Sequence, residues 1–391
     1  MDPRELAQLD ERWSMHNYRR FGVEFVEGAG AVLVDSEGRE YLDFLTGISV
    51  CSLGHCHPDV VAAIADQAGK LMHTSNLFLS EPAVELARAL AESSLGGATF
   101  FCNSGAEANE AAIKIARKAA HARGIASPRI VVLEGGFHGR TMGAVSASSR
   151  MAANPSFAPY LEGFDVVSRE DPAAFEEAVG PDTAAVLIEP VQGEAGIYPI
   201  ADEVLSAARR ASDSVGAALI FDEVQSGMGR TGTLWAYEPS GVVPDLMTTA
   251  KALGGGFPVG ACVAGEAWAG VLEPGDHGST FAGGPMASRA ALAALEATSD
   301  PTLLAAAVQR GERLRSGLSG VSAFSVVRGR GLMVGADLAS GEGAPELAQK
   351  LLENGLVTNA TGPATLRLLP PLIVSDEEID RALAIISDSV V

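Results

Sequence analysis

The sequence PDLMTTAK at residues 244–251 is an apolar run that ends in a lysine, and the glycine-rich loop ALGGG at 252–256 follows it directly. A second apolar run, AALIF at 217–221, ends in Asp222. Lys251 is one of five lysines in a chain of 391 residues. Short apolar runs of this kind are typical of strands that are buried on both faces of a parallel sheet. We therefore expect Asp222 and Lys251 to lie at the ends of two such strands.

A buried carboxylate and a lysine at strand ends are the two groups that an enzyme using pyridoxal phosphate requires. The lysine amine condenses with the cofactor aldehyde as a Schiff base, and the carboxylate keeps the pyridine nitrogen protonated so that the ring can accept electrons. A single lysine after a strand is more often an ordinary surface residue. The interpretation of Lys251 and Asp222 therefore depends on the rest of the chain.

The segments around these two residues alternate between helix and strand from about residue 80 onwards. Short apolar strands separated by amphipathic helices indicate an α/β fold with a mainly parallel sheet, in which ligands bind at the carboxyl ends of the strands. The predicted helices are 81–93, 105–123 and 201–215, and the predicted strands are 98–102, 129–134, 184–189, 217–222, 245–250 and 260–264. The residues at or just beyond strand ends that should share one pocket are Asn103, Phe137, Glu189, Asp222 and Lys251.

A length of 391 residues predicts more than one domain. We predict an N-terminal segment, 1–50, that packs with the small domain, a large cofactor-binding domain at 51–284, and a C-terminal small α+β domain at 285–391. The N-terminal segment contains an antiparallel meander with a DSEG turn at 35–38. The elements predicted after residue 284 are helices 285–298, 344–354 and 376–388 and strands 324–327, 332–338 and 365–369.

Composition excludes several classes of protein. A net charge of −21 argues against nucleic acid or an anionic membrane as a partner. The four cysteines are scattered, as in a reduced cytoplasmic protein. The run CSLGHCH at 51–57 suggests a metal site, but no second cluster supplies ligands at zinc spacing, so we expect no metal. The N-terminus shows no apolar signal region and no run is long enough to span a bilayer, so we expect a cytoplasmic enzyme.

The run NSGAEANE at 103–110 predicts a strand end, a tight turn and a helix start. Ser104 and Glu107 have the spacing of a capping box, and Gly105 and Ala106 allow a ligand to approach the backbone. The free amides and the positive dipole of a helix start favour phosphate binding. An ordinary capped helix is an equally good interpretation of this run by itself. The chain contains no P-loop motif for a nucleoside triphosphate.

The run GGFHGRT at 135–141 places an aromatic residue and an arginine just after a predicted strand. The Phe137 ring can stack on a planar cofactor, and Arg140 can bind a carboxylate through two parallel hydrogen bonds. The alternative is that Phe137 belongs to the core and that Arg140 forms a surface ion pair. We assign His138 no catalytic role from the sequence alone.

Seven motifs occur in this order: NSGAEANE, GGFHGRT, EPVQGE, IFDEVQSGMGRTG, TTAKALGGGFPVGA, DHGSTFAGGP and LRLLPPL. Together they resemble the class III, or subgroup II, aminotransferases of the fold type I pyridoxal phosphate-dependent transferases. The resemblance extends from about residue 17 to about residue 386 and is closest to the acetylornithine aminotransferases. It implies a large domain with a mainly parallel sheet of the seven-stranded type, a smaller α+β domain, and pyridoxal 5'-phosphate as the cofactor.

The resemblance implies cofactor-binding roles for residues of several motifs. Lys251 would bind pyridoxal phosphate covalently and then move the proton during transfer, Asp222 would pair with the pyridine nitrogen, and Phe137 would stack on the ring. The remaining implied cofactor-binding residues are Ser104, Gly105 and Ala106 at the phosphate, Val224 and Gln225 beside the ring, and Thr280, which would reach the phosphate from the other subunit of a homodimer.

The resemblance also implies a substrate site. Arg140 and Ser279 would hold the substrate, with Arg140 on the α-carboxylate of the amino donor. Glu194 and Arg367 resemble the switch pair of the family, in which the arginine binds the second carboxylate of 2-oxoglutarate and the glutamate covers it when the donor has no such group. The pair answers an electrostatic problem, because an unpaired guanidinium in a closed site would reject a neutral chain.

The implied reaction moves the terminal amino group of N2-acetylornithine to 2-oxoglutarate, as a step of arginine biosynthesis. One alternative keeps this chemistry and changes the donor to ornithine, succinylornithine, an ε-amino lysine derivative or 4-aminobutyrate. Others are an aminomutase or racemase reaction, or a non-catalytic homologue. The intact pairs Lys251 with Asp222 and Glu194 with Arg367 favour an active transaminase that uses 2-oxoglutarate.

Four positions leave the identity of the donor open. Gly22, Leu79 and Ala282 depart from the proline, aromatic residue and glycine that are common in the family near the substrate entrance. His138 stands where the ornithine enzymes tend to have tryptophan, which argues weakly against ornithine.

Overall fold

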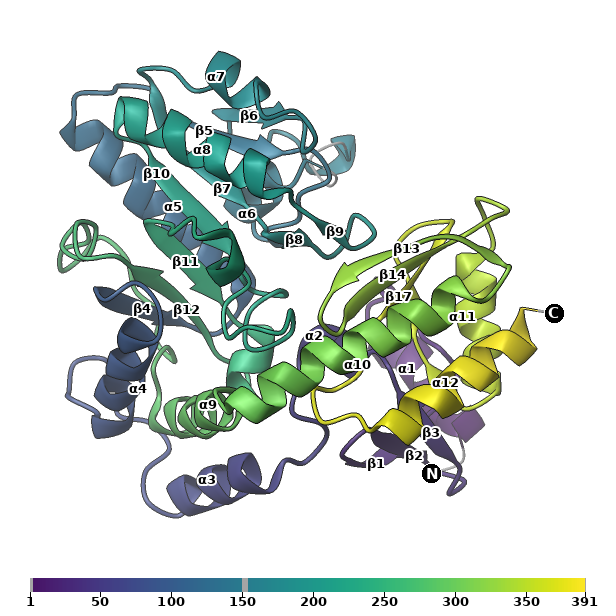
Figure 1. The fold of residues 1–391 in the computed structure, drawn as a ribbon. Coiled ribbons are helices and arrows are strands. Elements are labelled where there is room, and N and C mark those ends of the chain that lie inside the picture. The colour runs from purple at the N-terminus through teal and green to yellow at the C-terminus, as the bar shows by residue number, and fades with distance from the viewer. Residues whose placement is uncertain (1–2, 150–153, 391) are drawn as a thin grey trace.

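The computed structural model describes residues 3–149 and 154–390, and its largest element is a seven-stranded sheet (Figure 1). The strand order is β4-β12-β11-β10-β7-β5-β6, in which β12 is antiparallel to both neighbours and the strands from β11 to β6 are parallel. The bounds are β4 (Ala98–Cys102), β5 (Arg129–Leu133), β6 (Phe164–Val167), β7 (Thr183–Ile188), β10 (Ala218–Asp222), β11 (Leu246–Thr249) and β12 (Gly260–Ala264). This confirms the predicted α/β class with a mainly parallel sheet.

Helices cover both faces of this sheet because alternate residues of a strand point to opposite sides. In β10, Leu219 and Phe221 belong to one hydrophobic cluster with Leu205 of α8, whereas Ile220 belongs to a second cluster with Ile113 of α5. The covering helices are α3 (Pro58–Ala68), α4 (Glu81–Glu92), α5 (Gly105–Ala122), α6 (Met142–Ala147), α7 (Ala174–Ala178), α8 (Asp202–Val215) and α9 (Pro285–Thr298).

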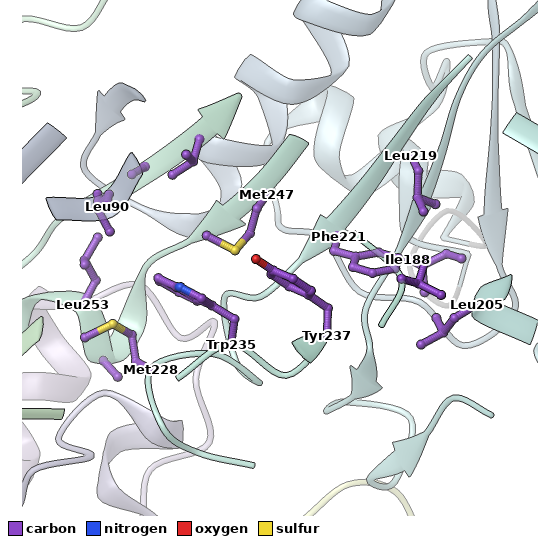
Figure 2. Packing of buried hydrophobic residues seen from close by; sticks show 14 of the residues in the cluster. Leu90, Ile188, Leu205, Leu219, Phe221, Met228, Trp235, Tyr237, Met247 and Leu253 are labelled. Carbon is purple, nitrogen blue, oxygen red and sulfur yellow. The ribbon is translucent and has the colours of Figure 1, made fainter. Parts of the chain in front are cut away.

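The loop after β10 completes the first of these clusters. Figure 2 shows Trp235 and Tyr237, which come from this loop, beside Met247 of β11. The Trp235 indole is buried, and its Nε1 donates a hydrogen bond to the carbonyl oxygen of Ser93 at 2.8 Å, so its polar atom is satisfied. The loop that begins at Asp222 is therefore anchored in the core, which fixes the strand end.

The C-terminal part forms a second hydrophobic core around the sheet β13-β14-β17-β16. Its elements are α10 (Pro301–Ser319), β13 (Phe324–Arg330), β14 (Met333–Leu338), α11 (Ala344–Glu353), β16 (Asn359–Ala360), β17 (Thr365–Leu368) and α12 (Asp376–Ser389). The N-terminal strands β1 (Phe25–Ala29), β2 (Val32–Asp35) and β3 (Glu40–Asp43) form a meander, and β3 pairs in parallel with β15 (Leu356–Val357).

The domain boundaries at residues 50 and 284 stay predictions. One observation bears on the second boundary, because Ala290, Ala291 and Leu295 of α9 are buried in the core of the large sheet. In Figure 1, α10 then runs from the end of α9 towards the C-terminal sheet, so the chain leaves the large sheet along this helix.

In and around the large sheet, most predicted elements begin and end within two residues of the observed ones. The observed bounds are the same as the predicted ones for strands 98–102 and 260–264 and for helix 285–298. Elements that the sequence analysis did not predict are α1 (Pro3–Trp13), α3, α6, α7, α10 and the strands β6, β8 (Val191–Gln192), β9 (Tyr198–Pro199), β15 and β16. In α10 the glycines Gly311 and Gly317 lower helix propensity, but both pack closely on neighbouring chain. The short helical turns are α2 (Thr46–Ser49), η1 (Pro155–Phe157), η2 (Glu238–Ser240) and η3 (Lys251–Gly254).

A buried arginine joins the loop after β10 to two other parts of the chain. The Arg230 guanidinium is fully buried and donates hydrogen bonds to the hydroxyls of Ser49, at 2.9 Å, and Ser52, at 2.7 Å. It also donates to the carbonyl oxygens of Leu332, at 3.1 Å, and Pro370. Arg230 therefore holds the N-terminal and C-terminal segments against the large sheet.

In the part of the chain that the structure describes, the partners of the Arg230 guanidinium are neutral groups, namely serine hydroxyls and backbone carbonyls, and not a carboxylate in direct contact. Burial lowers the pKa of Arg230 to about 9, and the charge of Asp43 opposes this shift. The segment 46–49 held by Arg230 has φ angles of 50° to 68° at every residue, a left-handed region that is unfavourable for residues such as Ile48. Such strain persists only where the surroundings enforce it, and the Arg230 hydrogen bonds supply part of that constraint.

We predict that Arg230→Met lowers the free energy of unfolding by about 2 kcal/mol or more, because the hydroxyls and carbonyls that it contacts lose a buried donor. Urea unfolding of the two proteins measures the difference. Arg313→Met is the matched control, since Arg313 forms an exposed pair with Asp380 and such pairs contribute little. An Arg230 variant no less stable than the Arg313 variant would contradict the assigned role.

Candidate active site

Several strand ends meet at one edge of the large sheet. Strands β11, β10, β7 and β5 are neighbours and run in parallel, and Lys251, Asp222, Glu189 and Phe137 lie at or shortly after their respective carboxyl ends. Asn103 follows β4, which ends at the same edge. The chain thus brings these residues together as the parallel topology predicts.

Lys251 lies directly after β11 in a strained conformation, with a φ angle of 39°. Burial lowers the pKa of its amine below the ordinary value. The charge of Glu194 opposes this shift and the charge of Arg367 adds to it, which places Lys251 near both side chains. A lysine in this state holds a nucleophilic amine more readily than a solvated one.

Asp222 is buried and held by donors from three sides. Its Oδ2 accepts hydrogen bonds from Asn109 Nδ2 and His138 Nδ1, both at 2.8 Å, and its Oδ1 accepts one from the Val224 amide at 3.0 Å. Asn109 is itself oriented, because its Oδ1 accepts a hydrogen bond from Thr248 Oγ1 at 2.8 Å. The Asp222 carboxylate therefore has a fixed position as well as a charge.

His138 is buried against Asp222. Burial by itself lowers the pKa of the imidazole, but the hydrogen bond to Asp222 and the charges of Asp222 and Glu189 raise it more, so the net pKa lies above the ordinary value. The backbone amide of His138 donates to Ser148 Oγ at 2.8 Å. A protonated His138 donates this hydrogen bond to the Asp222 carboxylate.

The capping box predicted at the start of α5 is present in one of its two hydrogen bonds. Ser104 Oγ accepts a hydrogen bond from the Glu107 amide at 3.3 Å, as predicted. The Glu107 carboxylate, however, accepts from the backbone amide and the Nδ2 of Asn103. The capping box is therefore only half formed, because Asn103 offers this carboxylate two N–H donors where Ser104 offers one.

The first turn of α5 has the properties of an anion site. Within the described residues, the amides of Gly105 and Ala106 have no hydrogen-bond acceptor. A Cβ atom on Gly105 would lie 2.6 Å from Val224 Cγ1, so only glycine fits between the helix start and the loop after Asp222. The two free amides and the helix dipole together favour a phosphate at this point.

The loop after β5 holds Phe137 through its backbone. The Phe137 amide donates to Glu189 Oε1 at 2.9 Å, and the Gly193 amide donates to Glu189 Oε2 at 3.2 Å. Burial raises the pKa of Glu189 to about 7, while the charge of His138 opposes the shift. The Phe137 ring is partly exposed, and the exposed Arg140 guanidinium lies 5.2 Å from its centroid. Glu189 therefore ties two of the predicted motifs together.

Glu194 and Arg367 form an ion pair in the structure. Arg367 is buried in β17, where its Nε donates to Asn359 Oδ1 at 3.0 Å. Gln225 lies between the two: its Oε1 accepts from Arg367 Nη1 at 3.2 Å and its Nε2 donates to Glu194 Oε1 at 3.3 Å. Burial raises the pKa of Glu194, but the charge and the hydrogen bond of Arg367 lower it more, so its net pKa lies below the ordinary value.

Ser279 and Thr280 lie on the segment before α9. Ser279 Oγ accepts a hydrogen bond from Asn103 Nδ2 at 2.9 Å, and its carbonyl oxygen accepts one from Asn76 Nδ2 at 3.1 Å. Thr280 is exposed, and Phe281 beside it is 69% exposed. Ser279 is thus joined to the edge of the sheet, while Thr280 faces outward from the chain.

Residues 14–390 match the class-III aminotransferase family. The chain belongs to the class-III aminotransferases. An acetylornithine aminotransferase of Caldanaerobacter subterraneus subsp. tengcongensis is 46% identical over 388 residues, which cover 98% of each chain. The solved ornithine aminotransferase of Toxoplasma gondii superposes with a TM-score of 0.94 at 35% identity, covering 100% of this chain and 95% of the other. The N-acetylornithine aminotransferase of Stenotrophomonas maltophilia gives a TM-score of 0.85 at 38% identity, with 98% of each chain covered.

Aminotransferases of this class depend on pyridoxal phosphate, and the site fits that cofactor. Burial lowers the pKa of the Lys251 amine, which favours its neutral, nucleophilic form. Asp222 presents a fixed carboxylate for the pyridine nitrogen, and the free amides at Gly105 and Ala106 suit the phosphate. Phe137 offers a partly exposed ring for stacking. This aminotransferase therefore holds, at one edge of its sheet, a group for each part of the cofactor.

The sequence analysis missed three members of the aminotransferase site: Asn109, His138 and Thr248. Asn109 and His138 lie inside recognised motifs, but nothing in the local pattern shows that their side chains turn towards Asp222. Thr248 is an internal residue of a strand, where a threonine is ordinary. Only the tertiary arrangement of β5, β10, β11 and α5 brings Asn109 and His138 to the Asp222 carboxylate and Thr248 to Asn109.

Residues 3–149 and 154–390 show neither a metal-binding cluster nor a membrane-spanning helix. No group of three or more His, Cys, Asp and Glu side chains there is arranged to hold a metal ion. No helix in that part of the chain is both long and apolar enough to cross a membrane. The four cysteines are free thiols.

Glu223, the neighbour of Asp222, is a second buried acid. Its carboxylate accepts hydrogen bonds from Ser226 Oγ at 2.8 Å and from the Tyr237 amide at 2.9 Å. Burial raises the pKa of Glu223 to about 7, the hydrogen bonds oppose the shift, and the charge of Asp222 adds to it. Glu223 thus holds the loop after β10, and its burial lowers stability once the carboxyl group ionises.

Glu223 predicts a pH dependence of stability. Its pKa in the folded protein, about 7, exceeds its ordinary value of 4.5, so the folded state binds more protons and stability is lost as pH rises through this window. Between pH 5 and 8 we expect Glu223→Gln to gain about 2 kcal/mol relative to wild type, since glutamine carries no charge. Urea unfolding at both pH values measures the change, and Glu134→Gln on the exposed surface is the control. A constant difference across this range would show that Glu223 is not desolvated.

Proposed function

We propose that this aminotransferase transfers the terminal amino group of N2-acetylornithine to 2-oxoglutarate, yielding N-acetylglutamate 5-semialdehyde and glutamate. The observation that carries the proposal is the Glu194–Arg367 pair beside Lys251, because it suits a site that must take a donor without a second carboxylate and an acceptor with one. The 46% identity to an acetylornithine aminotransferase along nearly the whole chain supports the choice of donor.

When bound, pyridoxal phosphate supplies the electron sink that stabilises negative charge on the substrate carbon. The charges of Glu194, Arg367, Asp222 and Glu189 all act on the Lys251 amine, and we assign to this amine the proton that leaves the donor carbon and is later returned. Asp222, held in place by Asn109 and His138, would pair with the ring nitrogen of the cofactor. The two half-reactions follow one another in the same pocket, with the donor product leaving before the acceptor binds.

The remaining residues bind and orient. Gly105 and Ala106 would offer their free amides to the phosphate beside Ser104, and Phe137 would stack on the ring. Val224 and Gln225 would also hold the cofactor, and Gln225 contacts the ion pair as well. Arg140 receives the α-carboxylate of the donor, and Ser279 assists from the segment fixed by Asn103.

The Glu194–Arg367 ion pair determines which charge the pocket presents to each substrate. While Glu194 contacts Arg367, the pocket presents a neutral surface to the acetylamide end of the donor. When 2-oxoglutarate enters, its distal carboxylate takes the place of Glu194 on the guanidinium, which is a favourable exchange because the geometry of carboxylate and guanidinium is retained. The buried Arg367 itself stays in place on Asn359.

Ornithine is the second candidate donor. The superposition on the Toxoplasma gondii ornithine aminotransferase, with a TM-score of 0.94, favours it by shape, although the identity is lower at 35%. Succinylornithine, ε-amino lysine derivatives and 4-aminobutyrate are further members of the donor panel. Leu79 is 95% exposed and Ala282 is buried. Both residues line the same pocket, so the departures at these positions bear on donor shape.

We expect N2-acetylornithine to bleach the yellow absorbance of the pyridoxal phosphate-loaded protein about tenfold faster than ornithine, because the Glu194 carboxylate that could bind a second ammonium is already paired with Arg367. Each donor is added singly without an acceptor, and 2-oxoglutarate should then restore the band. Fastest bleaching by another donor would reassign the substrate, and a protein that never turns yellow would contradict the cofactor.

The control for this measurement is Lys251→Ala. Loss of the amine should reduce turnover by on the order of 10⁴-fold, as for other residues that act directly on the reacting atoms. Lys350→Ala, at the exposed surface of α11, should leave turnover unchanged. Full turnover in the Lys251 variant would overturn the central assignment.

We also propose a cytoplasmic homodimer that serves arginine biosynthesis. Exposed apolar side chains gather near Thr280, and such a patch is typical of a surface that a partner covers. The members with the largest exposed fractions are Leu77 at 85%, Phe78 at 70%, Leu79 at 95% and Phe281 at 69%. Thr280 faces outward among them, which suits a residue that reaches the phosphate of the other subunit.

Co-expression of two defective chains tests this arrangement. One chain carries Lys251→Ala and the other carries Thr280→Asp, which puts a carboxylate beside the phosphate. If Thr280 acts across the interface, the mixed dimer contains one intact site and should recover about half of the wild-type activity per dimer. If Thr280 acts within its own chain, mixing restores nothing. Sedimentation of the wild-type protein as a monomer would contradict the proposal independently.

A further inference from the structure

Glu194 lies on a short hairpin between the two sheets. Strands β8 and β9 pair antiparallel with Gln192 opposite Tyr198, and Glu194 is in the turn that joins them. In this turn Ile197 has a φ angle of 62°, which is unfavourable for a β-branched residue. The turn therefore keeps its shape only because its surroundings impose it.

The turn rests on the C-terminal sheet beside Arg367. Ile197 is fully buried in a small cluster with Met333 and Leu369. A Cβ atom on Gly335 would lie 2.7 Å from the carbonyl oxygen of Gly196, so the two backbones touch there. Gly335 is directly opposite Arg367 across the β14–β17 pair. The position of the hairpin on this sheet thus sets the distance between Glu194 and its partner.

An aromatic ring fixes the hairpin from the other side. The Tyr198 ring lies between two guanidinium groups, with Arg169 Cζ at 4.0 Å and Arg328 Cζ at 4.1 Å from its centroid. Arg169 follows β6 of the large sheet, whereas Arg328 belongs to β13 of the C-terminal sheet. The ring therefore links the two sheets through the hairpin.

Both arginines are anchored. Arg328 forms two hydrogen bonds with Asp337, at 2.6 and 3.0 Å, and its side chain is 14% exposed. Arg169 donates from Nη1 to Gln192 Oε1 at 3.4 Å, across the hairpin from Tyr198. A cation beside an aromatic face is attracted more strongly when water is excluded, so two partly buried cations hold the ring firmly.

We propose that Tyr198, held between Arg169 and Arg328, is a positioning residue that keeps Glu194 against Arg367 and so favours amino donors without a second carboxylate. The inference rests on the proposed function and deepens it. A loosened hairpin leaves the buried Arg367 without its carboxylate for more of the time, and this penalises a neutral donor chain. The dicarboxylic acceptor brings its own carboxylate, so its binding depends less on the hairpin.

The test compares Tyr198→Leu with Tyr198→Phe in the pyridoxal phosphate-loaded protein. Leucine removes the ring, whereas phenylalanine keeps both faces and loses only a hydroxyl that makes no hydrogen bond within the described residues. We expect Tyr198→Leu to raise KM for the donor about fivefold, with KM for 2-oxoglutarate changed less than about twofold, and Tyr198→Phe to restore both. Phe164→Leu, which removes the ring beneath Arg117 at 5.5 Å, is the matched control and should change neither KM.

A second measurement uses no substrate. Hydrogen exchange of backbone amides in residues 190–200 should be faster in Tyr198→Leu than in wild type, Tyr198→Phe or Phe164→Leu. Equal rises in both KM values, or unchanged exchange in Tyr198→Leu, would overturn the proposal. If wild type itself does not use N2-acetylornithine, the proposed function fails instead, and the same comparison is made with the donor and acceptor that wild type does use.

Discussion

A carboxylate withdrawn from water must be satisfied by donors in fixed positions, and the site around Lys251 is organised by this requirement at Asp222. The donors come from α5, from the loop after β5 and from the backbone just beyond β10, so one residue sets the relative placement of three elements. Thr248 orients Asn109 and extends the network to β11, the strand that precedes Lys251. The hydrogen bonds that position Asp222 therefore also join the strands and the helix that form the large sheet and its cover.

Opposite charges act on one another throughout the pocket. Burial opposes the charged form of Lys251, while the neighbouring carboxylates favour it. Arg367 pairs with Glu194, and Gln225 touches both. Because each guanidinium or carboxylate that loses its partner here would be costly, a substrate that brings its own charge can exchange with a resident one. Under the proposed function, this exchange allows one pocket to take two substrates of different charge.

Strain in the backbone marks the places where distant segments meet at the site. The left-handed segment 46–49 is held by Arg230, and the left-handed Ile197 is held on the C-terminal sheet. Both segments lie close to the Glu194–Arg367 pair, since Ser49 contacts the Gln225 carbonyl and Ile197 is three residues beyond Glu194. The substrate side of the site thus depends on how the parts of the chain are joined, whereas the cofactor side is built on the large sheet.

The sequence by itself determined the alternation of helices and strands and the placement of Asp222 and Lys251 at strand ends, because apolar runs and the glycines that end them are local signals. Through its ordered motifs it also indicated the pairing of Glu194 with Arg367, which are 173 residues apart. Only the tertiary structure decided that Asn109 and His138 hold Asp222 and that Glu107 bonds Asn103 in place of Ser104. The physical reason is that a side chain's partner depends on which strands are neighbours and which way a helix is turned, and no local pattern contains either.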